Sequence, residues 1–293
     1  MSLFNVYTGL LKVFPLPVMK KDDVNFLYDL EHPQYTVLKS RYPIVDVAGG
    51  GDDFSKAVNL LHWVSSNIYH VGNYAGSVHP NAINYLDYSF GKGEKLGINC
   101  VALSTILAEC LLAVGIKARK VFIMPCSPYD GDNHVVAEVF IKDMGKWVML
   151  DPTYNAWFKD ENGNALGLLE LRSLLADQSS VYFNSDAKYN DENWTEETSS
   201  MLIEYFAKNL FYFQLPEMSS HNEENIATSN NVLSNPDLRF ISLCPDGFDP
   251  KTARVSNVMY RKKLYGEQPW MAEALKAEMD TKYVFCSADD FKK

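Results

Sequence analysis

The feature that most restricts the fold of this chain is a helix pattern followed by three strand patterns within residues 99–150. Residues 99–114 carry apolar side chains at helical spacing, and Gly115 stands where a left-handed C-terminal cap is expected. Residues 118–124, 135–141 and 146–150 are typical of strands, and Asp143-Met144-Gly145 between the last two is a hairpin signal. This order predicts a helix followed by an antiparallel hairpin, with a helix covering one face of the sheet.

The flanking segments predict one elaborated domain in three parts. Residues 1–54 form an N-terminal segment that packs on the core, residues 55–157 form the core, and residues 158–293 form a helical and loop extension of the same domain. Four prolines predict extended or irregular backbone in residues 1–48. Asp53 is the expected N-cap of a helix over residues 55–69.

The remaining segments predict loops, helices and one short strand. The glycines of residues 72–97 predict a surface loop, and the Ser- and Asn-rich residues 216–238 predict an exposed loop. Apolar spacing predicts further helices at residues 166–175, 196–210 and 269–278. It also predicts one short strand at residues 283–286.

Composition excludes several classes of protein. The chain is 47% hydrophobic, which suits a packed core, and its net charge is −10 with no cluster of Lys and Arg, which argues against a nucleic-acid partner. No run of 18 apolar residues predicts a membrane span, and the N-terminus lacks the features of a signal peptide. We therefore expect a cytoplasmic protein. Its five cysteines are widely scattered, which favours free thiols over a disulfide framework or a zinc ribbon.

Cys100 is the cysteine best placed to react. A thiol attacks only as the thiolate, and its ordinary pKa of about 8.5 leaves it mostly protonated at neutral pH. Asn99 is a good N-cap, so Cys100 would lie in the first turn of the helix, where unpaired N–H groups and the helix dipole stabilise an anion. Cys110 lies on the apolar stripe of the same helix, where a cysteine acts as a small hydrophobe.

A base and a group that orients it follow on the hairpin. His134 begins one strand, and the next strand runs directly into Asp151. Alternation along the strands puts both side chains on the same face, close to the distance of a diagonal pair. Asp151 could then fix the imidazole tautomer while His134 takes the thiol proton. These residues predict a Cys-His-Asp catalytic triad.

Four motifs resemble the transglutaminase-like superfamily. They are Gly97-Ile-Asn-Cys100, Leu111-Leu-Ala-Val-Gly-Ile-Lys-Ala-Arg119, Asn133-His134-Val-Val-Ala-Glu-Val and Lys146-Trp-Val-Met-Leu-Asp151-Pro-Thr153. The similarity covers about residues 55–157, and residues 158–213 are more loosely similar to bacterial members. The resemblance implies a papain-like α+β fold (the transglutaminase core), in which the Cys100 helix packs on an antiparallel sheet that carries His134 and Asp151.

The resemblance also implies a function. It predicts a cysteine-dependent acyl-transfer enzyme, with hydrolysis of a peptide or side-chain amide through a thioester favoured over transfer to an amine; a non-catalytic peptide-binding module is the other hypothesis. Relatives complete the oxyanion hole with a side-chain donor, for which Asn84, Tyr85, Tyr88 and Asn99 are candidates. Eukaryotic transglutaminases have Gln before the cysteine and Trp after it. Asn99 and Val101 stand there in this chain, which argues against protein crosslinking.

Metals and cofactors are not expected. His62, His70 and His79 lie on a helix face or beside a loop, and a zinc site from His70, His79 and a carboxylate has no support in their spacing. The sequence thus predicts an enzyme that needs no cofactor and acts on a peptide or protein substrate. The substrate itself and the oligomeric state stay open.

Overall fold

The computed structural model describes residues 3–18, 22–74, 76, 78–91, 96–222, 239–267, 269–281 and 283–293. Its helices are α1 (Leu3–Val13), α2 (Gln34–Arg41), α3 (Ile44–Ala48), α4 (Asp53–Asn67), α5 (Ala82–Phe90), α6 (Cys100–Ala113), a 3-10 turn (Lys142–Met144), α7 (Leu168–Ala176), α8 (Glu196–Asn209), α9 (Pro250–Tyr265), α10 (Pro269–Asp280) and α11 (Ala288–Phe291). Its strands are β1 (Leu27–Tyr28), β2 (Ala118–Met124), β3 (His134–Ile141), β4 (Lys146–Leu150), β5 (Phe158–Lys159), β6 (Tyr182–Phe183), β7 (Lys188–Tyr189), β8 (Glu192–Asn193), β9 (Tyr212–Pro216), β10 (Met218–Ser219), β11 (Phe240–Leu243) and β12 (Tyr283–Phe285).

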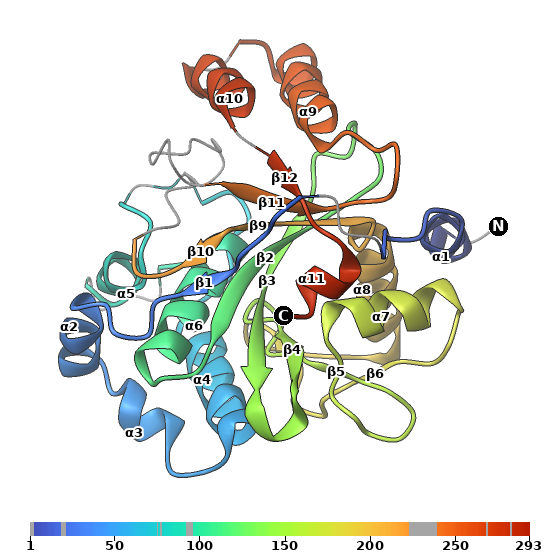
Figure 1. Ribbon diagram of the computed structural model, residues 1–293. Helices are drawn as coiled ribbons and strands as arrows, with labels where there is room; N and C mark the ends of the chain where they lie inside the picture. The colour runs from blue at the N-terminus through green and yellow to red at the C-terminus, as the bar shows by residue number, and fades with distance from the viewer. Residues whose placement is uncertain are drawn as a thin grey trace.

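A six-stranded sheet organises the molecule, in the order β12-β11-β9-β2-β3-β4 (Figure 1). Its neighbours pair antiparallel except β11 and β12, which pair parallel. The predicted hairpin is present, with Glu138 opposite Met149 and Phe140 opposite Trp147. The three C-terminal strands extend the sheet from the β2 side, so residues beyond 157 complete the same sheet as the predicted core.

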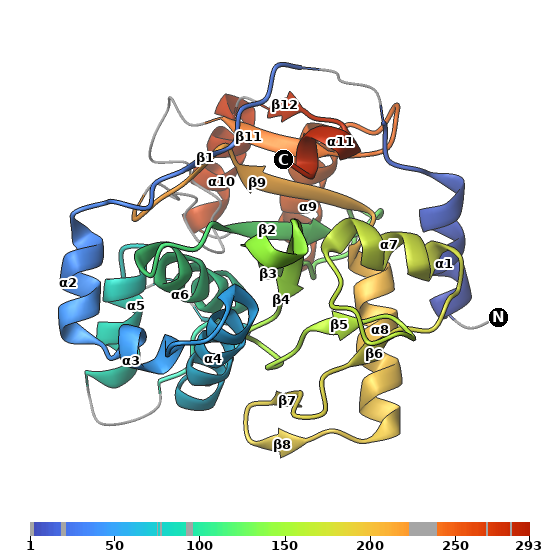
Figure 2. The same ribbon diagram turned by 60° about the horizontal axis from the view of Figure 1, so that its bottom comes forward.

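Helices cover both faces of β2, β3 and β4 (Figures 1 and 2). Ala118, Val139 and Leu150 face α4, α5 and α6 and form one apolar core with them. Val121, Val136 and Met149 face the other way and pack with residues of α7 and α8. With both faces covered, β2 is buried along its whole length. The fold is α+β, as predicted.

Local signals fix the ends of the elements that carry the site. The Asn99 side chain caps α6 by accepting a hydrogen bond from the N–H of Ala102, at 3.1 Å. Gly115 ends the helix with a φ of 83°, and Gly145 closes the hairpin with a φ of 63°. Both glycines adopt the left-handed backbone that their positions require. The sequence prediction was right at all three positions.

A buried ion pair joins β2 to β3. Arg119 and Glu138 are opposite each other in the ladder, their side chains are 1% and 2% exposed, and Nη2 lies 2.7 Å from Oε2. Glu138 also accepts a hydrogen bond from the N–H of Leu168 at the start of α7, and Arg119 donates to the carbonyl of Phe291 in α11. The pair therefore ties the C-terminal helices to the register of the sheet.

Several sequence predictions were wrong. Residues 1–48 contain α1, α2 and α3 rather than irregular backbone, because Pro33 and Pro43 stand at the N-caps of α2 and α3, where a missing N–H costs no hydrogen bond. The loop predicted for residues 72–97 contains α5, and Asp52 rather than Asp53 caps α4. Most of the loop predicted for residues 216–238 lies outside the described residues.

Within the described residues, no helix is long and apolar enough to cross a bilayer. The division into residues 1–54, 55–157 and 158–293 stays a prediction.

The buried ion pair predicts a stability contrast. Arg119→Met leaves the Glu138 carboxylate buried without its cation, so we expect a loss of about 3–5 kcal/mol in the free energy of unfolding. Arg41→Gln breaks the exposed pair with Asp87 and should cost less than about 1 kcal/mol. Urea denaturation of the two variants measures both values. Equal losses would contradict the structural role given to Arg119.

Candidate active site

Cys100 is the first residue of α6, and its thiol is partly exposed. Cys110, Cys244 and Cys286 are buried, whereas Cys126 is partly exposed like Cys100. The first N–H groups of a helix have no partner within it and carry the positive end of the helix dipole. Cys100 therefore lies where backbone N–H groups can stabilise a negative charge.

His134 and Asp151 meet on one face of the β3–β4 hairpin. His134 Nε2 lies 2.7 Å from Asp151 Oδ2, and the two residues are 2% and 0% exposed. Asp151 follows β4, where continuation of the register places it diagonal to His134. Its second oxygen accepts a hydrogen bond from the N–H of Thr153 at 2.9 Å. The carboxylate is thus fixed by a turn on one side and holds the imidazole on the other.

Aromatic side chains hold the imidazole in place. Tyr154, Tyr205 and Phe206 surround the His134 ring at centroid distances of 5.7, 5.5 and 5.8 Å. Because Nε2 is bound by Asp151, Nδ1 is the ring nitrogen left for a second partner. That partner is the thiol of Cys100, which interacts with the His134 ring.

Cys100 and His134 shift each other's pKa values. Burial alone would raise the pKa of the thiol, but hydrogen bonds from His134 and His70 and the charges of the two rings outweigh burial and lower it. Burial alone would lower the pKa of His134, but the Asp151 carboxylate, together with Cys100, raises it. The arrangement favours a thiolate beside an imidazolium at neutral pH.

His70 is a second imidazole at the thiol. Its backbone forms a parallel bridge with Ile98, two residues before Cys100, and the Nδ1 atom lies 3.1 Å from the Tyr189 hydroxyl. Asn190 fixes its backbone, because the His70 N–H donates to Asn190 Oδ1 at 2.7 Å. Sequence analysis missed this residue. The apolar run that ends at His70 gave no sign that the segment would pair beside α6.

A cavity of about 250 Å³ opens over Cys100. His70, Asn99 and His134 line it near the hairpin and α6, and Arg254 and Arg261 of α9 line it as well. The loop of residues 125–133, which leads from β2 into His134, forms most of its rim. The cavity is therefore built from the predicted core and from parts of the chain after it.

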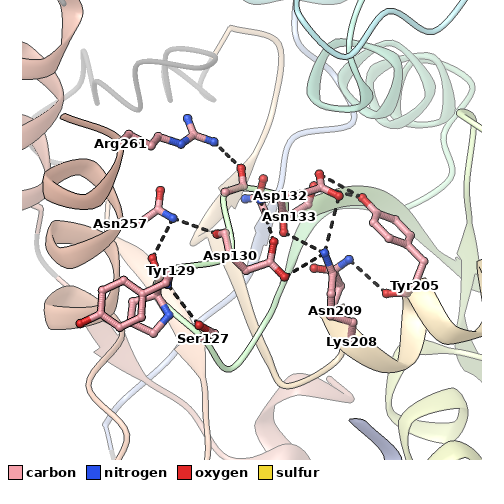
Figure 3. A network of polar contacts seen from close by, with 12 residues as sticks. Ser127, Tyr129, Asp130, Asp132, Asn133, Tyr205, Lys208, Asn209, Asn257 and Arg261 are labelled. Atoms are coloured by element: carbon pink, nitrogen blue, oxygen red, sulfur yellow. Dashed lines mark hydrogen bonds and ion pairs between the residues drawn. The ribbon is translucent and has the colours of Figure 1, made fainter. Parts of the chain in front are cut away.

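That loop is held between α8 and α9 (Figure 3). Asn257 of α9 donates hydrogen bonds to the carbonyls of Pro128 and Asp130 at 3.0 and 2.9 Å, and Arg261 donates to the carbonyl of Gly131. From α8, Lys208 forms ion pairs with Asp130 and Asp132, at 3.0 and 3.6 Å. Contacts from both sides thus set the backbone that positions His134.

One comparison with known proteins identifies a family that part of the chain is similar to. Residues 44–152 match the transglutaminase-like superfamily. This segment includes His70, Cys100, His134 and Asp151 but not α8 or α9, and the resemblance predicted from the four motifs is confirmed. The chain has the predicted α+β fold with the Cys100 helix packed on the sheet, and residues 44–152 are the part that is similar to the superfamily.

One solved structure is similar to part of the chain. It is a putative cysteine protease from Cytophaga hutchinsonii, with 16% sequence identity and a TM-score of 0.32. The match covers 55% of this chain and 54% of that protein, so the chain spans about half of the length of its structural relative. The comparison with curated proteins gave no match.

The transglutaminase-like segment contains four predicted oxyanion or cleft candidates, of which one lines the cavity. Asn99 borders it beside Cys100, although its side-chain oxygen is engaged in capping α6. Asn84, Tyr85 and Tyr88 lie on α5 and do not line the cavity. Tyr85 and Tyr88 pack with the α4–α6 core, and Asn84 donates to the carbonyl of His79. The three residues of α5 are thus not among those that line the cavity, and the side-chain donor to the oxyanion stays a prediction.

The positions of the histidines bear on the question of a zinc site. Within the described residues, no group of three His, Cys, Asp or Glu side chains could hold a metal ion. His70 contacts Tyr189 and the thiol, whereas His79 lines a separate pocket with His32 and His221. The two histidines that a zinc site would need therefore face different cavities.

Thiol alkylation tests the electrostatics of Cys100. The pKa of Cys100 is lowered to about 6, and the pKa of Cys126 is raised by burial, so iodoacetamide should modify Cys100 at least about tenfold faster at pH 7. The rate at Cys100 should fall as the pH drops through 6. His134→Ala should shift this fall to higher pH, because the thiolate loses its imidazolium partner. Mass spectrometry of the peptides measures each rate, and equal rates at the two cysteines would contradict the assignment.

Proposed function

We propose that this protein is a cysteine hydrolase that cleaves a peptide or side-chain amide through a thioester on Cys100. The observation that carries the proposal is the buried contact between His134 and Asp151, 2.7 Å long, beside the thiol at the start of α6. The transglutaminase-like match of residues 44–152 supports a cysteine enzyme of this kind. In this proposal, Cys100 is the nucleophile, His134 moves the proton and Asp151 orients the ring.

Acylation proceeds from the thiolate–imidazolium pair. Cys100 Sγ attacks the carbonyl carbon, and the electron pair of the C=O bond moves to the oxygen. When the C–N bond breaks, His134 gives its proton to the departing amine and the acyl group remains on sulfur as a thioester. Asp151 keeps the ring in place and stabilises its positive charge before the proton leaves.

Deacylation reverses the roles of the same groups. His134, now neutral, takes a proton from a water molecule as the water oxygen attacks the thioester carbonyl. The C–S bond breaks, the carboxylic acid leaves, and the thiolate–imidazolium pair is restored. An amine in place of water would give a new amide, which is the reaction of a transglutaminase.

Two groups can stabilise the oxyanion. The backbone N–H of Cys100, at the start of α6, has no partner within the helix and can donate to the oxyanion. His70 is the candidate side-chain donor: its Nδ1 lies 3.1 Å from the Tyr189 hydroxyl, and in the neutral tautomer in which Nδ1 accepts from that hydroxyl the ring proton is on Nε2. His70 thus takes the role that we had predicted for the side chains of α5.

Substitutions in the triad test the proposal through hydrolysis rates. We would screen peptide amides with and without a primary amine, and we expect release of the free acid. Cys100→Ser should abolish this activity, and Asp151→Asn should lower kcat about 100-fold or more, because the ring loses its orientation. Cys126→Ser is the matched control and should keep full activity. Hydrolysis that survives Cys100→Ser would contradict the proposal, and amine incorporation without hydrolysis would reassign the acceptor.

The role of His70 makes a separate prediction. His70→Ala removes one donor to the oxyanion, so kcat should fall about 10- to 100-fold with little change in KM. His70→Gln keeps a side-chain N–H and should recover part of the rate. A rise in KM at constant kcat would instead assign His70 to substrate binding.

A further inference from the structure

Helix α9 forms a wall of the active-site cavity although it lies outside the segment that matches the superfamily. Residues at helical spacing along one face of α9, from Ala253 to Arg261, line the cavity together with Cys100. Asn257 and Arg261 attach this face to the loop before His134 (Figure 3). The wall is therefore fixed relative to the thiol, and its side chains can select what binds there.

Arg254 is the most buried charged residue of this wall, with 8% of its surface exposed. Its Nε donates to Glu278 Oε1 at 2.7 Å, and Glu278 Oε2 accepts from the Tyr283 hydroxyl at 2.8 Å. Within the described residues, this is the hydrogen bond that the Arg254 guanidinium makes. A guanidinium has five N–H groups, so the edge formed by Nη1 and Nη2 remains available.

Protein atoms do not fully enclose the Nη1–Nη2 edge of Arg254. Arg254 lines the cavity, and neither Nη atom belongs to the enclosed polar atoms without a partner, in contrast to Nη1 of Arg119. Burial alone would lower the pKa of Arg254, but the charges of Glu278 and Tyr283 outweigh burial and raise it. The side chain is thus a permanent cation that Glu278 holds in one orientation.

The acidic groups at the rim have a lysine beside them. Asp130 and Asp132 both lie within ion-pair distance of Lys208, at 3.0 and 3.6 Å. Arg261 adds a second guanidinium to the same wall, seven residues after Arg254, and it donates to the Gly131 carbonyl. The charged side chains of α9 and its rim loop that line the cavity are thus two guanidiniums and two carboxylates, and the carboxylates have Lys208 as a counter-ion.

We propose that Arg254 binds a carboxylate of the acyl donor, so that the amides cleaved at Cys100 are those that carry a free carboxylate. The two parallel N–H groups of a guanidinium edge match the two oxygens of a carboxylate, which gives both affinity and orientation. The carboxylate could belong to a chain terminus or to an acidic side chain. This substrate class rests on the proposed function, since it needs Cys100 as the nucleophile.

Pairs of alkylating reagents test the site without a known substrate. Iodoacetyl-glycine, iodoacetyl-β-alanine and iodoacetyl-γ-aminobutyrate carry a terminal carboxylate at increasing reach, and each has a neutral primary amide as its partner. Iodoacetyl-glutamic acid amide and iodoacetyl-glutamine amide form the side-chain pair. The quantity measured is the ratio of alkylation rates at Cys100, acid over amide, divided by the same ratio for glutathione.

We expect this normalised ratio to reach at least about tenfold for one pair, which also tells a terminal carboxylate from a side-chain carboxylate. Arg254→Lys keeps the ion pair with Glu278 but removes the planar edge, and it should lower the ratio. Arg254→Met with Glu278→Gln removes the site without leaving a buried charge unpaired, and it should bring the ratio to one. Arg41→Gln, on an exposed pair with Asp87, is the control and should leave the ratio unchanged.

A ratio near one for every pair in the unmodified protein would overturn the proposal. So would a high ratio that survives the double variant. The rates of the neutral amides report the proposed function independently, through their dependence on His134. Fast, His134-dependent alkylation without any preference for the acids would leave the nucleophile in place and refute only the carboxylate site.

Discussion

The pairing register of β3 with β4 is the constraint on which the rest of the site depends. With Glu138 opposite Met149, the two strands put His134 and Asp151 on one face and within hydrogen-bond distance. A slip of one residue would turn one of the two side chains to the opposite face. The buried pair of Arg119 with Glu138 extends the same register to β2 and to the C-terminal helices. The same strand contacts thus stabilise the fold and position His134 and Asp151.

The active site also contains residues from outside the segment that matches the superfamily. Residues 44–152 supply the thiol, both imidazoles and the carboxylate. Helix α8 supplies Tyr205 and Phe206 around the His134 ring, and α9 supplies a wall of the cavity. Since the chemical groups come from the segment and this wall comes from residues after it, the wall is where the choice of substrate would be made.

Sequence analysis predicted the local parts of this site well. Asn99 as a cap, Gly115 as a terminator and the strands at residues 118–124 and 146–150 depend on neighbouring residues, and the structure has all of them. The proximity of His134 and Asp151 followed from the alternation of strand residues, which is also a local rule.

The parts that sequence analysis missed depend on contacts between distant segments. His70 reaches the thiol because its backbone pairs with Ile98, and no local pattern encodes that pairing. Strand β9 is buried along its whole length, so it lacks the alternation by which exposed strands are recognised. Sequence analysis predicted no helix over residues 250–265, and α9 brings Arg254 to the cavity that Cys100 also lines. Its partner Glu278 comes from another helix, 24 residues later.

The central claim is that His134 and His70 hold Cys100 as a thiolate at neutral pH. Titration of thiolate ultraviolet absorbance, taken as the difference between the unmodified protein and Cys100→Ala, measures this directly. The account predicts that the thiolate of Cys100 appears with a midpoint near the lowered pKa of about 6. A midpoint at or above the ordinary thiol pKa of about 8.5 would contradict it.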